Sequence, residues 1–478
     1  MAKMFIAGEL VGAGSGKTYD VINPATGEVV DNAPLGDATD TRAAIDAAAA
    51  AFSAWADTSA ESRAQLILKG IEAVKKEIPE LSVTLTKEQG KPLGDSQREI
   101  EHFLHGMNFY AGLASKTRGS YVPLPDNKMY GMVLKQPVGV CGAIIPWNFP
   151  ITLMGTKVGP ALAAGCTVVV KPASSTPLTT LRIIELLNSV GLPKGVLSVV
   201  TGPGGVVGEE LLQNPKVRRI AFTGESKTGQ HVVATAGAQM KRITLELGGS
   251  DPMIFCEDGD MDKALTAASV GRFYNCGQAC LAVKRLYIVE SVYDQFVEKL
   301  LGKVAKLTVG NGMEKTTRLG PMHTKVQREE IEAQVADAVA RGAKVLTGGK
   351  RPEGEQFASG HYYLPTVLVD VPEDARCVTE ETFGPLLPVF KVKDLDEGIA
   401  KANSSVYGLG SSVWTKDLSK ARKAAEKIEA GNVWINSLHI GYDEMPFGGV
   451  KLSGFGREHG PEALEYYLET KGVVIATS

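Results

Sequence analysis

A chain of 478 residues is too long for one ordinary hydrophobic core, so two or three domains are expected. Hydrophobic residues make up 44% of the chain and charged residues 22%, and 51 Lys and Arg are scattered among 54 Asp and Glu. This balance is that of an ordinary globular protein, and it argues against a nucleic acid or a membrane surface as partner.

The cysteines and the N-terminus indicate the compartment. Six cysteines without a pair of CxxC motifs are too few for a disulfide scaffold or a cysteine-based zinc site, so no metal is predicted. The first residues lack the apolar run of a signal peptide, and no stretch approaches the roughly 18 apolar residues that span a bilayer. The sequence therefore predicts a cytoplasmic protein.

The first third of the chain is predicted to be mainly helical. Apolar residues fall at helical spacing from about 43 to 76, and a second helical stretch covers roughly 100–114. Residues 120–136 differ, because VPLP interrupts them and MYGMVLKQP has the composition of a strand. This segment is predicted to form a hairpin arm outside the core.

Residues 139–249 alternate between two kinds of segment. Short, continuously apolar runs (CGAIIP, CTVVVKP, GVLSVVTG, RRIAFTG and RITLELGG) are separated by helical segments that begin near Leu153, Pro177, Gly205 and Lys227. Alternation of this kind indicates a parallel, doubly wound sheet whose strands are covered on both faces.

A second alternating region runs from about 253 to 435. Its candidate strands are RLYIVE, KVLTGG, TVLVDV, LLPVFKV and GNVWIN, with helices between them. The Gly-rich tail ends in LEYYLETKGVVIAT, and a terminal strand of this kind needs a partner. The sequence thus predicts a second α/β domain followed by an edge strand.

Cys280 is the first candidate for chemistry. A lone cysteine is usually a small buried hydrophobe, but Cys280 follows Gly277 and Gln278, which belong to a turn. It is therefore expected at a helix start or in a tight loop, where exposed amides and the helix dipole favour a thiolate. Cys276, four residues earlier, is interpreted as a packing residue.

Two polar residues at predicted strand ends could assist a nucleophile. Glu246 is flanked by apolar residues at the end of a buried strand, where a raised pKa would suit general-base work. Asn148 lies between the two prolines of PWNFP, and its amide could donate to a developing oxyanion. The alternatives are a carboxylate that caps the next loop and a structural Asx turn.

The glycine-containing loops are weaker signals. FTGESKTG places Gly224 and Gly229 between a strand and a helix, a generic anion site, although Glu225 would repel a phosphate held closely. Lys171 in VKPASSTP could hydrogen-bond a ribose or could simply be solvated. EETFGP, residues 380–385, could be an ordinary turn.

Seven segments in this order resemble the aldehyde dehydrogenase superfamily over essentially the whole chain. They are PWNFP, VKPASSTP, FTGESKTG, LELGG, FYNCGQAC, EETFGP and PFGGVKLSGFG. The resemblance implies a Rossmann-like doubly wound cofactor domain (1–118 and 138–248), a second α/β catalytic domain (249–448), and an oligomerisation arm with a terminal strand (119–137 and 449–478).

The resemblance also implies NAD(P)-dependent oxidation of an aldehyde to an acid. Cys280 would attack the aldehyde carbon to give a thiohemiacetal, with Asn148 and the Cys280 amide steadying the oxyanion. Hydride transfer would leave a thioester, which water activated by Glu246 would hydrolyse.

For the cofactor, the resemblance implies that Lys171 holds the adenosine ribose and Glu381 the nicotinamide ribose. Phe383 would pack beside the nicotinamide ring, Trp147 would lie near the adenosine side, and Gly224 and Gly229 would border the pyrophosphate.

Three positions depart from the family pattern. Ser174 replaces a glutamate that accepts the ribose hydroxyls in NAD-preferring members, which favours NADP over NAD. Glu225 stands where many members have serine; some NAD-using members share the acid, which weakens that inference. Ser250 stands where lysine is common.

The substrate is less well indicated. Members that act on succinic semialdehyde commonly carry an arginine where this chain has Thr156, so the sequence favours a substrate other than a short semialdehyde. The loop of residues 437–449 is expected at the mouth of the substrate tunnel. There His439 and Tyr442 could contact a hydroxylated or aromatic aldehyde, or have no ligand role.

Three other classes were weighed against this one. A CoA-acylating dehydrogenase would transfer the acyl group to CoA, and a non-catalytic family member would serve as a binding protein. A cysteine hydrolase would need a histidine partner, yet none of the seven histidines lies in a comparable strand-end motif. The arm and terminal strand, as unpaired edges, imply a homodimer or homotetramer by resemblance.

Overall fold

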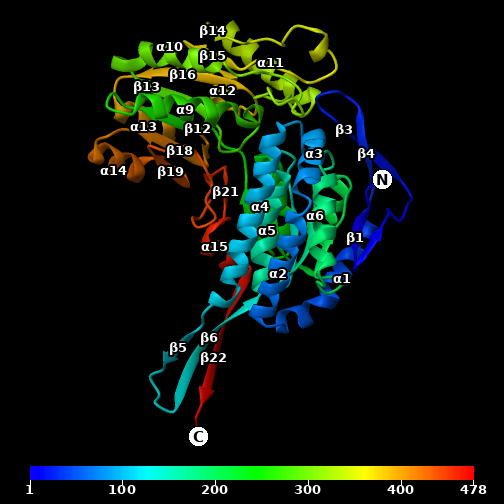
Figure 1. The fold of residues 1–478 in the computed structure, drawn as a ribbon. Helices are drawn as coiled ribbons and strands as arrows, with labels where there is room; N and C mark the ends of the chain where they lie inside the picture. Colours follow the sequence, from blue (N-terminus) through cyan, green and yellow to red (C-terminus); the bar gives the residue numbers. More distant parts are fainter. Residues whose placement is uncertain (478) are drawn as a thin grey trace.

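The computed structural model describes residues 1–477, which form two open α/β sheets and a projecting arm (Figure 1). The first sheet has the order β2-β1-β9-β8-β7-β10-β11-β21. Its strands are β1 (Met4–Ile6), β2 (Glu9–Val11), β7 (Val140–Ile144), β8 (Thr167–Lys171), β9 (Leu197–Val199), β10 (Val217–Thr223), β11 (Arg242–Glu246) and β21 (Gly454–Phe455). The five from β9 to β11 are mutually parallel, as their continuously apolar sequences predict.

Helices pack around this first sheet over a shared hydrophobic core. They are α1 (Ala38–Asp57), α2 (Ala60–Lys75), α3 (Ile78–Gln89), α4 (Leu93–Leu113), α5 (Pro150–Ala164), α6 (Leu178–Ser189), α7 (Glu209–Gln213) and α8 (Ser226–Gly237). A short hairpin of β3 (Thr18–Ile22) and β4 (Val29–Pro34) lies beside them.

The helix boundaries differ from the predicted ones for local reasons. The single helix expected over 43–76 is two, because the Ser59 side chain accepts from the Ser62 amide at 3.1 Å and starts a new helix. The helix expected near Leu153 begins at Pro150, since proline is favoured in the first turn, where its missing N–H costs nothing. Near Gly205 the chain forms a π-helical turn (Gly204–Gly208) before α7.

The second sheet has the order β14-β15-β16-β13-β12-β18-β19. Its strands are β12 (Asp251–Phe255), β13 (Val283–Val289), β14 (Lys344–Thr347), β15 (Thr366–Val369), β16 (Leu386–Val392), β18 (Gly410–Trp414) and β19 (Asn432–Ile435). Its helices are α9 (Met261–Phe273), α10 (Tyr293–Val304), α11 (Lys325–Ala340), α12 (Arg376–Thr379), α13 (Leu395–Asn403) and α14 (Leu418–Lys427). The predicted strands are present, and β12 and β18, which prediction missed, are interior strands between β13 and the edge strand β19.

The arm consists of β5 (Ser120–Pro123), β6 (Met129–Pro137) and β22 (Leu468–Ala476), in the order β22-β6-β5. It extends away from both sheets, with the C-terminus near its tip (Figure 1). The hairpin prediction is confirmed. The terminal strand, however, is not an unpaired edge: it pairs along its whole length with β6 of the same chain, from Leu468 opposite Pro137 to Ala476 opposite Met129.

The chain returns to the first sheet before it enters the arm. After β19 come β20 (Val450–Lys451), which pairs with β17 (Tyr407–Gly408) from before β18, and then β21 and α15 (Gly460–Glu465). Because β21 pairs with β11, the second sheet is an insertion between two adjacent strands of the first. The remaining short turns are η1 (Ala114–Lys116), η3 (Tyr274–Gly277), η4 (Glu290–Val292) and η5 (Glu355–Phe357). Within residues 1–477, no helix is long and apolar enough to cross a membrane.

Candidate active site

The carboxyl ends of four parallel strands bring polar side chains to one edge of the first sheet. Asn148 follows β7, and Lys171, Thr223 and Glu246 are the last residues of β8, β10 and β11. This edge is where open α/β sheets bind ligands. The chain then crosses to the second sheet, which contributes Cys280 from the turn before β13.

A cavity of about 390 Å³ joins the two sheets at this edge. Cys280, Glu246 and Thr223 line it together with aromatic side chains of Phe149, Tyr274 and Phe447. The two residues predicted as nucleophile and base therefore open on the same mostly apolar space. Exclusion of water from such a space strengthens every electrostatic interaction within it.

A strained turn presents Cys280 to the cavity. Asn275, Cys276 and Gly277 all have left-handed backbone angles, with φ of 50°, 56° and 72°. For residues other than glycine this conformation costs of order 1–3 kcal/mol each, and it persists only where the surroundings enforce it. Here the Asn275 side-chain amide donates to the Asn148 carbonyl at 3.1 Å, and the Gln278 side-chain oxygen accepts from the His323 amide at 2.8 Å.

The environment of the Cys280 thiol differs from the predicted one. The residue follows a 3₁₀ turn instead of starting a helix, and burial raises the pKa of its thiol to about 12. Only Lys284 opposes this rise, while Asp251, Glu246 and Glu381 add to it. Of the two settings predicted for Cys280, a helix start or a tight loop, the structure has the tight loop, and burial there favours the neutral thiol over the expected thiolate.

Lys284 links the nucleophile to the predicted cofactor residue Glu381. Its ammonium donates to the carbonyls of Cys280 and Gly249, at 2.9 and 2.7 Å, and to a carboxylate oxygen of Glu381 at 2.5 Å. The side chain is fully buried. Sequence analysis missed Lys284, because a lysine within a strand has no motif of its own.

Glu246 is buried and has no hydrogen-bond partner on either carboxylate oxygen among the described residues. Burial, and next the charge of Glu458, raise the pKa of its carboxyl well above the ordinary value, against the opposing charge of Lys157. A buried carboxyl group without hydrogen-bond partners destabilises the folded protein. Such a group is retained where it has another use.

Glu458 is a second carboxylate on the cavity wall that sequence analysis missed. It forms an ion pair with Lys157 at 2.6 Å, and its other oxygen accepts from the Thr156 hydroxyl at 2.6 Å. The Lys157 ammonium also donates to the Thr223 hydroxyl at 2.7 Å. Thr156, which stands where some family members carry an arginine, therefore holds the Glu458 carboxylate in place.

Asn148 lies in the turn after β7, where hydrogen bonds hold it beside the turn that carries Cys280. The Lys91 ammonium donates to the Asn148 carbonyl at 2.7 Å, and the Asn148 side-chain amide donates to the Gln278 carbonyl at 3.1 Å. A side-chain amide carries two N–H donors, so one remains for a ligand. Asn148 and the Cys280 turn are therefore directly bonded to each other.

The predicted cofactor residues lie around the strand ends, with two differences. Gly229 is inside α8, where the absence of a side chain allows Leu247 to pack, so it is not a loop residue as predicted. Trp147 stacks on His323, with ring centroids 4.5 Å apart, and meets Phe383 edge-on at 5.7 Å. Contact with Phe383 brings Trp147 to the side assigned to nicotinamide, which conflicts with its predicted adenosine-side position.

Lys171 and Ser174 provide a test of whether the strand ends suit a dinucleotide. The buried Lys171 ammonium donates to a single acceptor, the Pro172 carbonyl at 2.9 Å, and burial lowers its pKa to about 8. An ammonium has three donors, so its bonding is incomplete without a ligand. The Ser174 hydroxyl donates to the Gly202 carbonyl at 2.9 Å, and Gly224 stays partly exposed at the start of α8. These residues fit a nucleotide.

The loop predicted at the tunnel mouth divides into two parts. His439 lines the cavity, stacks on Trp434 with centroids 4.8 Å apart, and contacts the Leu281 carbonyl through Nδ1 at 2.9 Å. Tyr442 is about half exposed and is not among the residues lining the cavity. Of the other sequence departures, Glu225 is exposed at the N-cap of α8, and the buried Ser250 hydroxyl has no partner among the described residues.

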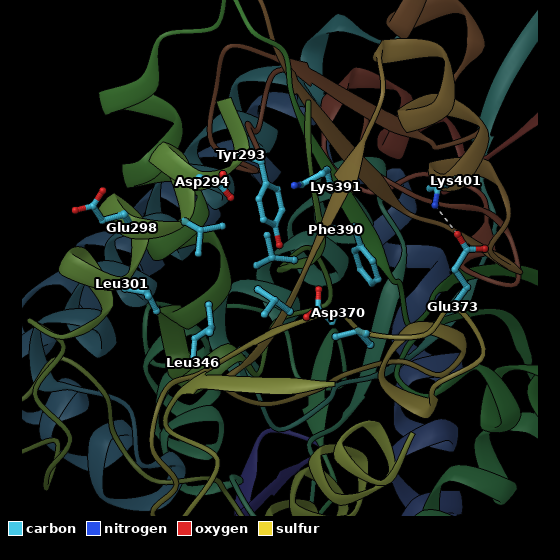
Figure 2. Close-up of a pocket in the computed structure, with 14 residues that line it drawn as sticks. Tyr293, Asp294, Glu298, Leu301, Leu346, Asp370, Glu373, Phe390, Lys391 and Lys401 are labelled. Carbon is cyan, nitrogen blue, oxygen red and sulfur yellow. Dashed lines mark hydrogen bonds and ion pairs between the residues drawn. The ribbon is translucent and has the colours of Figure 1, made fainter. Parts of the chain in front are cut away.

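A separate, larger cavity of about 780 Å³ lies between α10 and the strands β15 and β16 (Figure 2). Charges of both signs line it, among them Asp294, Asp370 and Lys391. The Lys391 ammonium lies over the Tyr293 ring, 4.8 Å from its centroid. This cavity contains none of the residues predicted to carry chemistry.

Comparison with known proteins gives the same assignment along the whole chain. The profile of the Aldehyde dehydrogenase family matches residues 11–473. The chain is 42% identical to a glutarate-semialdehyde dehydrogenase of Pseudomonas putida, covering 99% of this chain and 97% of that protein. It is 41% identical to the NADP(+) succinate-semialdehyde dehydrogenase GabD of Escherichia coli, covering 98% and 97%.

Solved structures agree. An NADP-dependent enzyme of E. coli superposes with a TM-score of 0.97 at 40% identity, covering 99% of this chain and 98% of that one. A betaine aldehyde dehydrogenase of Staphylococcus aureus in complex with NAD+ superposes with a TM-score of 0.98 at 36% identity, covering 100% and 95%.

The fold and these matches place the protein among the NAD(P)-dependent α/β oxidoreductases. Within that class, the chain belongs to the aldehyde dehydrogenase family. The predicted fold and the predicted NAD(P)-dependent oxidation of an aldehyde to an acid are confirmed at that level. The roles of individual residues, the domain boundaries and the cofactor preference stay predictions.

Proposed function

We propose that the protein oxidises its aldehyde through a thioester on Cys280 that water activated by Glu246 hydrolyses. The observation that carries this proposal is the shared cavity: a thiol and a carboxyl group without hydrogen-bond partners open on one apolar space. The Cys280 thiol loses its proton to solvent water as its sulfur adds to the aldehyde carbon, and the Asn148 amide and the Cys280 N–H steady the oxyanion of the thiohemiacetal. Lys171 and Glu381 would hold the NAD(P) cofactor, which would supply the hydride acceptor for conversion of the thiohemiacetal to the thioester.

Glu246 then completes the reaction. Its carboxylate takes a proton from water, the resulting hydroxide adds to the thioester carbon, and the sulfur leaves as the acid forms. The raised pKa of Glu246 suits this step, because a base is most effective when its pKa approaches the working pH. Glu458, held by Lys157 and Thr156, lies beside it and can pass the proton onward.

A burst experiment tests this division of roles. Glu246→Gln should form about one equivalent of reduced cofactor per site and then slow, because acylation proceeds while the thioester persists. Cys280→Ala should abolish the burst, and Cys276→Ala, which removes the neighbouring packing thiol, should keep the full rate. Full steady-state activity in Cys280→Ala would overturn the proposal.

The acyl acceptor separates this proposal from the CoA-acylating alternative. A carboxyl group positioned to activate water has no use when a thiol accepts the acyl group, so Glu246 favours hydrolysis. Product analysis with and without CoA decides between them. Acid formed at the same rate in both supports hydrolysis; acyl-CoA as the main product would replace it.

We also propose NADP as the preferred cofactor. Ser174 places no carboxylate near the buried Lys171 ammonium, so no acidic side chain there repels a 2′-phosphate. The relative from E. coli that carries NADP(+) in its name is 41% identical. Ser174→Glu should shift the ratio of kcat/KM values toward NAD, and a preference of about a hundredfold for NAD in the unchanged protein would contradict this.

For the substrate, we propose an aldehyde with an apolar body. Phe149, Tyr274 and Phe447 line the cavity, and Thr156 offers no cation for a short semialdehyde. The P. putida and E. coli relatives are named for glutarate and succinate semialdehydes, so both belong in the substrate panel. A higher kcat/KM for succinic semialdehyde than for aliphatic and aromatic aldehydes would refute this proposal.

Location and assembly stay predictions of the same kind. A homodimer or homotetramer assembled through the arm would cover the free edges of β5 and β22. Light scattering of the intact protein tests this: a monomer at micromolar concentration would contradict it. The cytoplasmic location rests on the sparse cysteines.

A further inference from the structure

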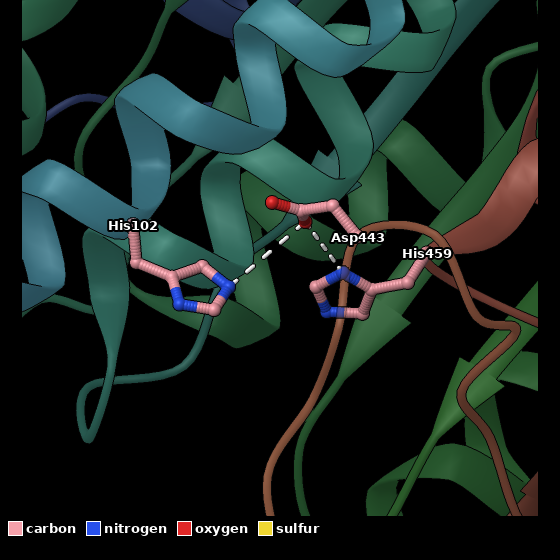
Figure 3. A group of neighbouring side chains, drawn as sticks. All are labelled: His102, Asp443 and His459. Carbon is pink, nitrogen blue, oxygen red and sulfur yellow. Dashed lines mark hydrogen bonds and ion pairs between the residues drawn. The ribbon is translucent and has the colours of Figure 1, made fainter.

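Three histidines surround one buried aspartate at the wall of the aldehyde cavity. Figure 3 shows two of them, His102 and His459, on either side of Asp443. Asp443 is 3% exposed and belongs to the loop between β19 and β20. His102 and His105 come from α4, and His459 directly precedes α15. His102 and His459 line the cavity, so this cluster forms part of its wall.

One oxygen of the aspartate faces two imidazoles. Oδ1 of Asp443 is 2.8 Å from Nδ1 of His459 and 3.9 Å from Nε2 of His102. All three ligand atoms lie within 4.8 Å of one another. The His102 Nε2 atom is buried and has no hydrogen-bond partner among residues 1–477. One potential ligand is therefore directed at the cluster without being bonded in it.

These separations suit a small divalent ion. Zinc lies about 2.0–2.2 Å from nitrogen and oxygen ligands, so tetrahedral geometry separates neighbouring ligand atoms by roughly 3.4 Å. The distances of 2.8 and 3.9 Å lie on either side of that value. Shifts of a few tenths of an ångström would bring both into range. The His459 proton then moves from Nδ1 to Nε2, with no net proton change.

The surroundings support the same ligand set. The His105 Nδ1 atom contacts the other oxygen of Asp443 at 2.6 Å, which orients the carboxylate as an outer partner does in metal sites. His459 has a left-handed backbone, with φ of 54°, a strained conformation that is typical of functional positions. Two imidazoles and one carboxylate are characteristic ligands of zinc, cobalt and nickel, and not of calcium or magnesium.

The second cluster of possible ligands in the described chain does not share these features. It comprises Cys256, Glu257 and Asp258. Both oxygens of Asp258 accept hydrogen bonds from the Thr415 hydroxyl, and one also accepts from the amides of Lys416 and Asp417. The Asp258 carboxylate therefore serves the fold and is not free for a ligand.

We propose that His102, Asp443 and His459 bind a divalent transition-metal ion of the zinc type in the wall of the aldehyde cavity. Three protein ligands leave at least one coordination position for water or another small ligand. The site is separate from Cys280, so it does not depend on the proposed catalytic role of that thiol. Sequence analysis had no signal for it, because the ligands are far apart in the chain and form no spacing motif.

Direct binding to a protein without the catalytic thiol tests the site. Cys280→Ser, treated with EDTA and dialysed, is titrated calorimetrically with ZnCl2, and with CoCl2 in a visible spectrometer. We expect one zinc ion per chain and the intense d–d bands of tetrahedral cobalt. Absence of stoichiometric zinc binding in this variant would overturn the proposal.

Further substitutions in the Cys280→Ser background assign the ligands. His102→Ala and Asp443→Asn should each abolish the cobalt bands, and His105→Ala should weaken binding by roughly 10- to 100-fold through the outer partner. His231→Ala removes an exposed imidazole on α8 that pairs with Glu209, and should leave binding unchanged. Circular dichroism checks the fold of each variant. Unchanged binding in His102→Ala would also refute the assignment.

Discussion

Two glutamates on the wall of the same cavity are equally buried and differ entirely in their partners. Glu99 is 3% exposed and Glu246 is 4% exposed. Glu99 forms an ion pair with Lys91 and accepts from the Ile151 amide at 2.8 Å, whereas Glu246 has no hydrogen bond within the described chain. A buried carboxylate that maintains the fold is fully bonded; one that lacks partners is available to a ligand.

The bonded glutamate also helps to position the proposed oxyanion donor, Asn148. Glu99 accepts from the first turn of α5, and its partner Lys91 donates to the carbonyl of Asn148. Glu99 thereby fixes the turn that carries the proposed oxyanion donor. The difference between the two glutamates predicts opposite responses to substitution.

The largest effect is expected at the ion pair. Lys91→Met leaves the Glu99 carboxylate buried without its cation, which should lower the free energy of unfolding by about 3–5 kcal/mol. Denaturant titration measures this loss. Adding Glu99→Leu should recover part of it, because an apolar pair no longer buries a charge. If Lys91→Met alone were as stable as the unchanged protein, the contrast drawn between Glu99 and Glu246 would be wrong.

Glu246→Gln should have the opposite effect on stability. The folded protein raises the pKa of Glu246, so this carboxyl favours folding at pH values below its ordinary pKa, and that contribution is lost as pH rises through the folded pKa. The variant should therefore match the unchanged protein near pH 4.5 and be more stable at pH 8, by roughly 1–3 kcal/mol. A stability difference independent of pH would contradict the raised pKa.

The rate at which Cys280 reacts with an alkylating agent tests the influence of Glu246 on the pKa of the thiol. Burial raises the pKa of its thiol to about 12, and the charge of Glu246 contributes to the rise. Alkylation by iodoacetamide without cofactor should therefore accelerate about tenfold per pH unit between pH 7 and 9. Glu246→Gln should react faster at each pH. A rate that levels off near pH 7 would indicate a thiolate already formed.

The smallest effect is expected at Thr156. Thr156→Val removes the hydroxyl that donates to Glu458 but keeps the shape of the side chain, and should cost about 1–2 kcal/mol of stability. Steady-state turnover should fall more than the burst, because Glu458 lies beside the proposed base. Equal losses in both phases would show that Thr156 does not act through deacylation.

The sequence predicted those features that depend on neighbours along the chain. Apolar runs predicted the parallel strands, VPLP predicted the hairpin, and strand-end motifs located Glu246 and Asn148. Partners distant in sequence could not be found this way. Lys284, Glu458 and the Lys91–Glu99 pair have no local pattern, since each depends on a residue brought near only by folding.

Errors of prediction arose where tertiary contacts override a local signal. Gly229 was predicted in a loop but lies in α8. It is a glycine there because Leu247 occupies the space that a side chain would fill. The strands β12 and β18 were missed because Pro252 in β12 and the glycine and serines at the start of β18 are unusual in strands, although both strands are buried inside the sheet. The tight loop around Cys280 was one of the two predicted settings, but the burial that raises the pKa of its thiol comes from distant parts of the chain and has no local signal.

The return of the C-terminal segment to the first sheet has a consequence for biosynthesis. The partners of β11 and β6 are β21 and β22, which lie in the last 25 residues of the chain. Until the ribosome has completed that segment, both strands keep exposed edges that invite pairing with other nascent chains. The first sheet, whose strands begin the chain, is therefore completed only after the second sheet has been synthesised.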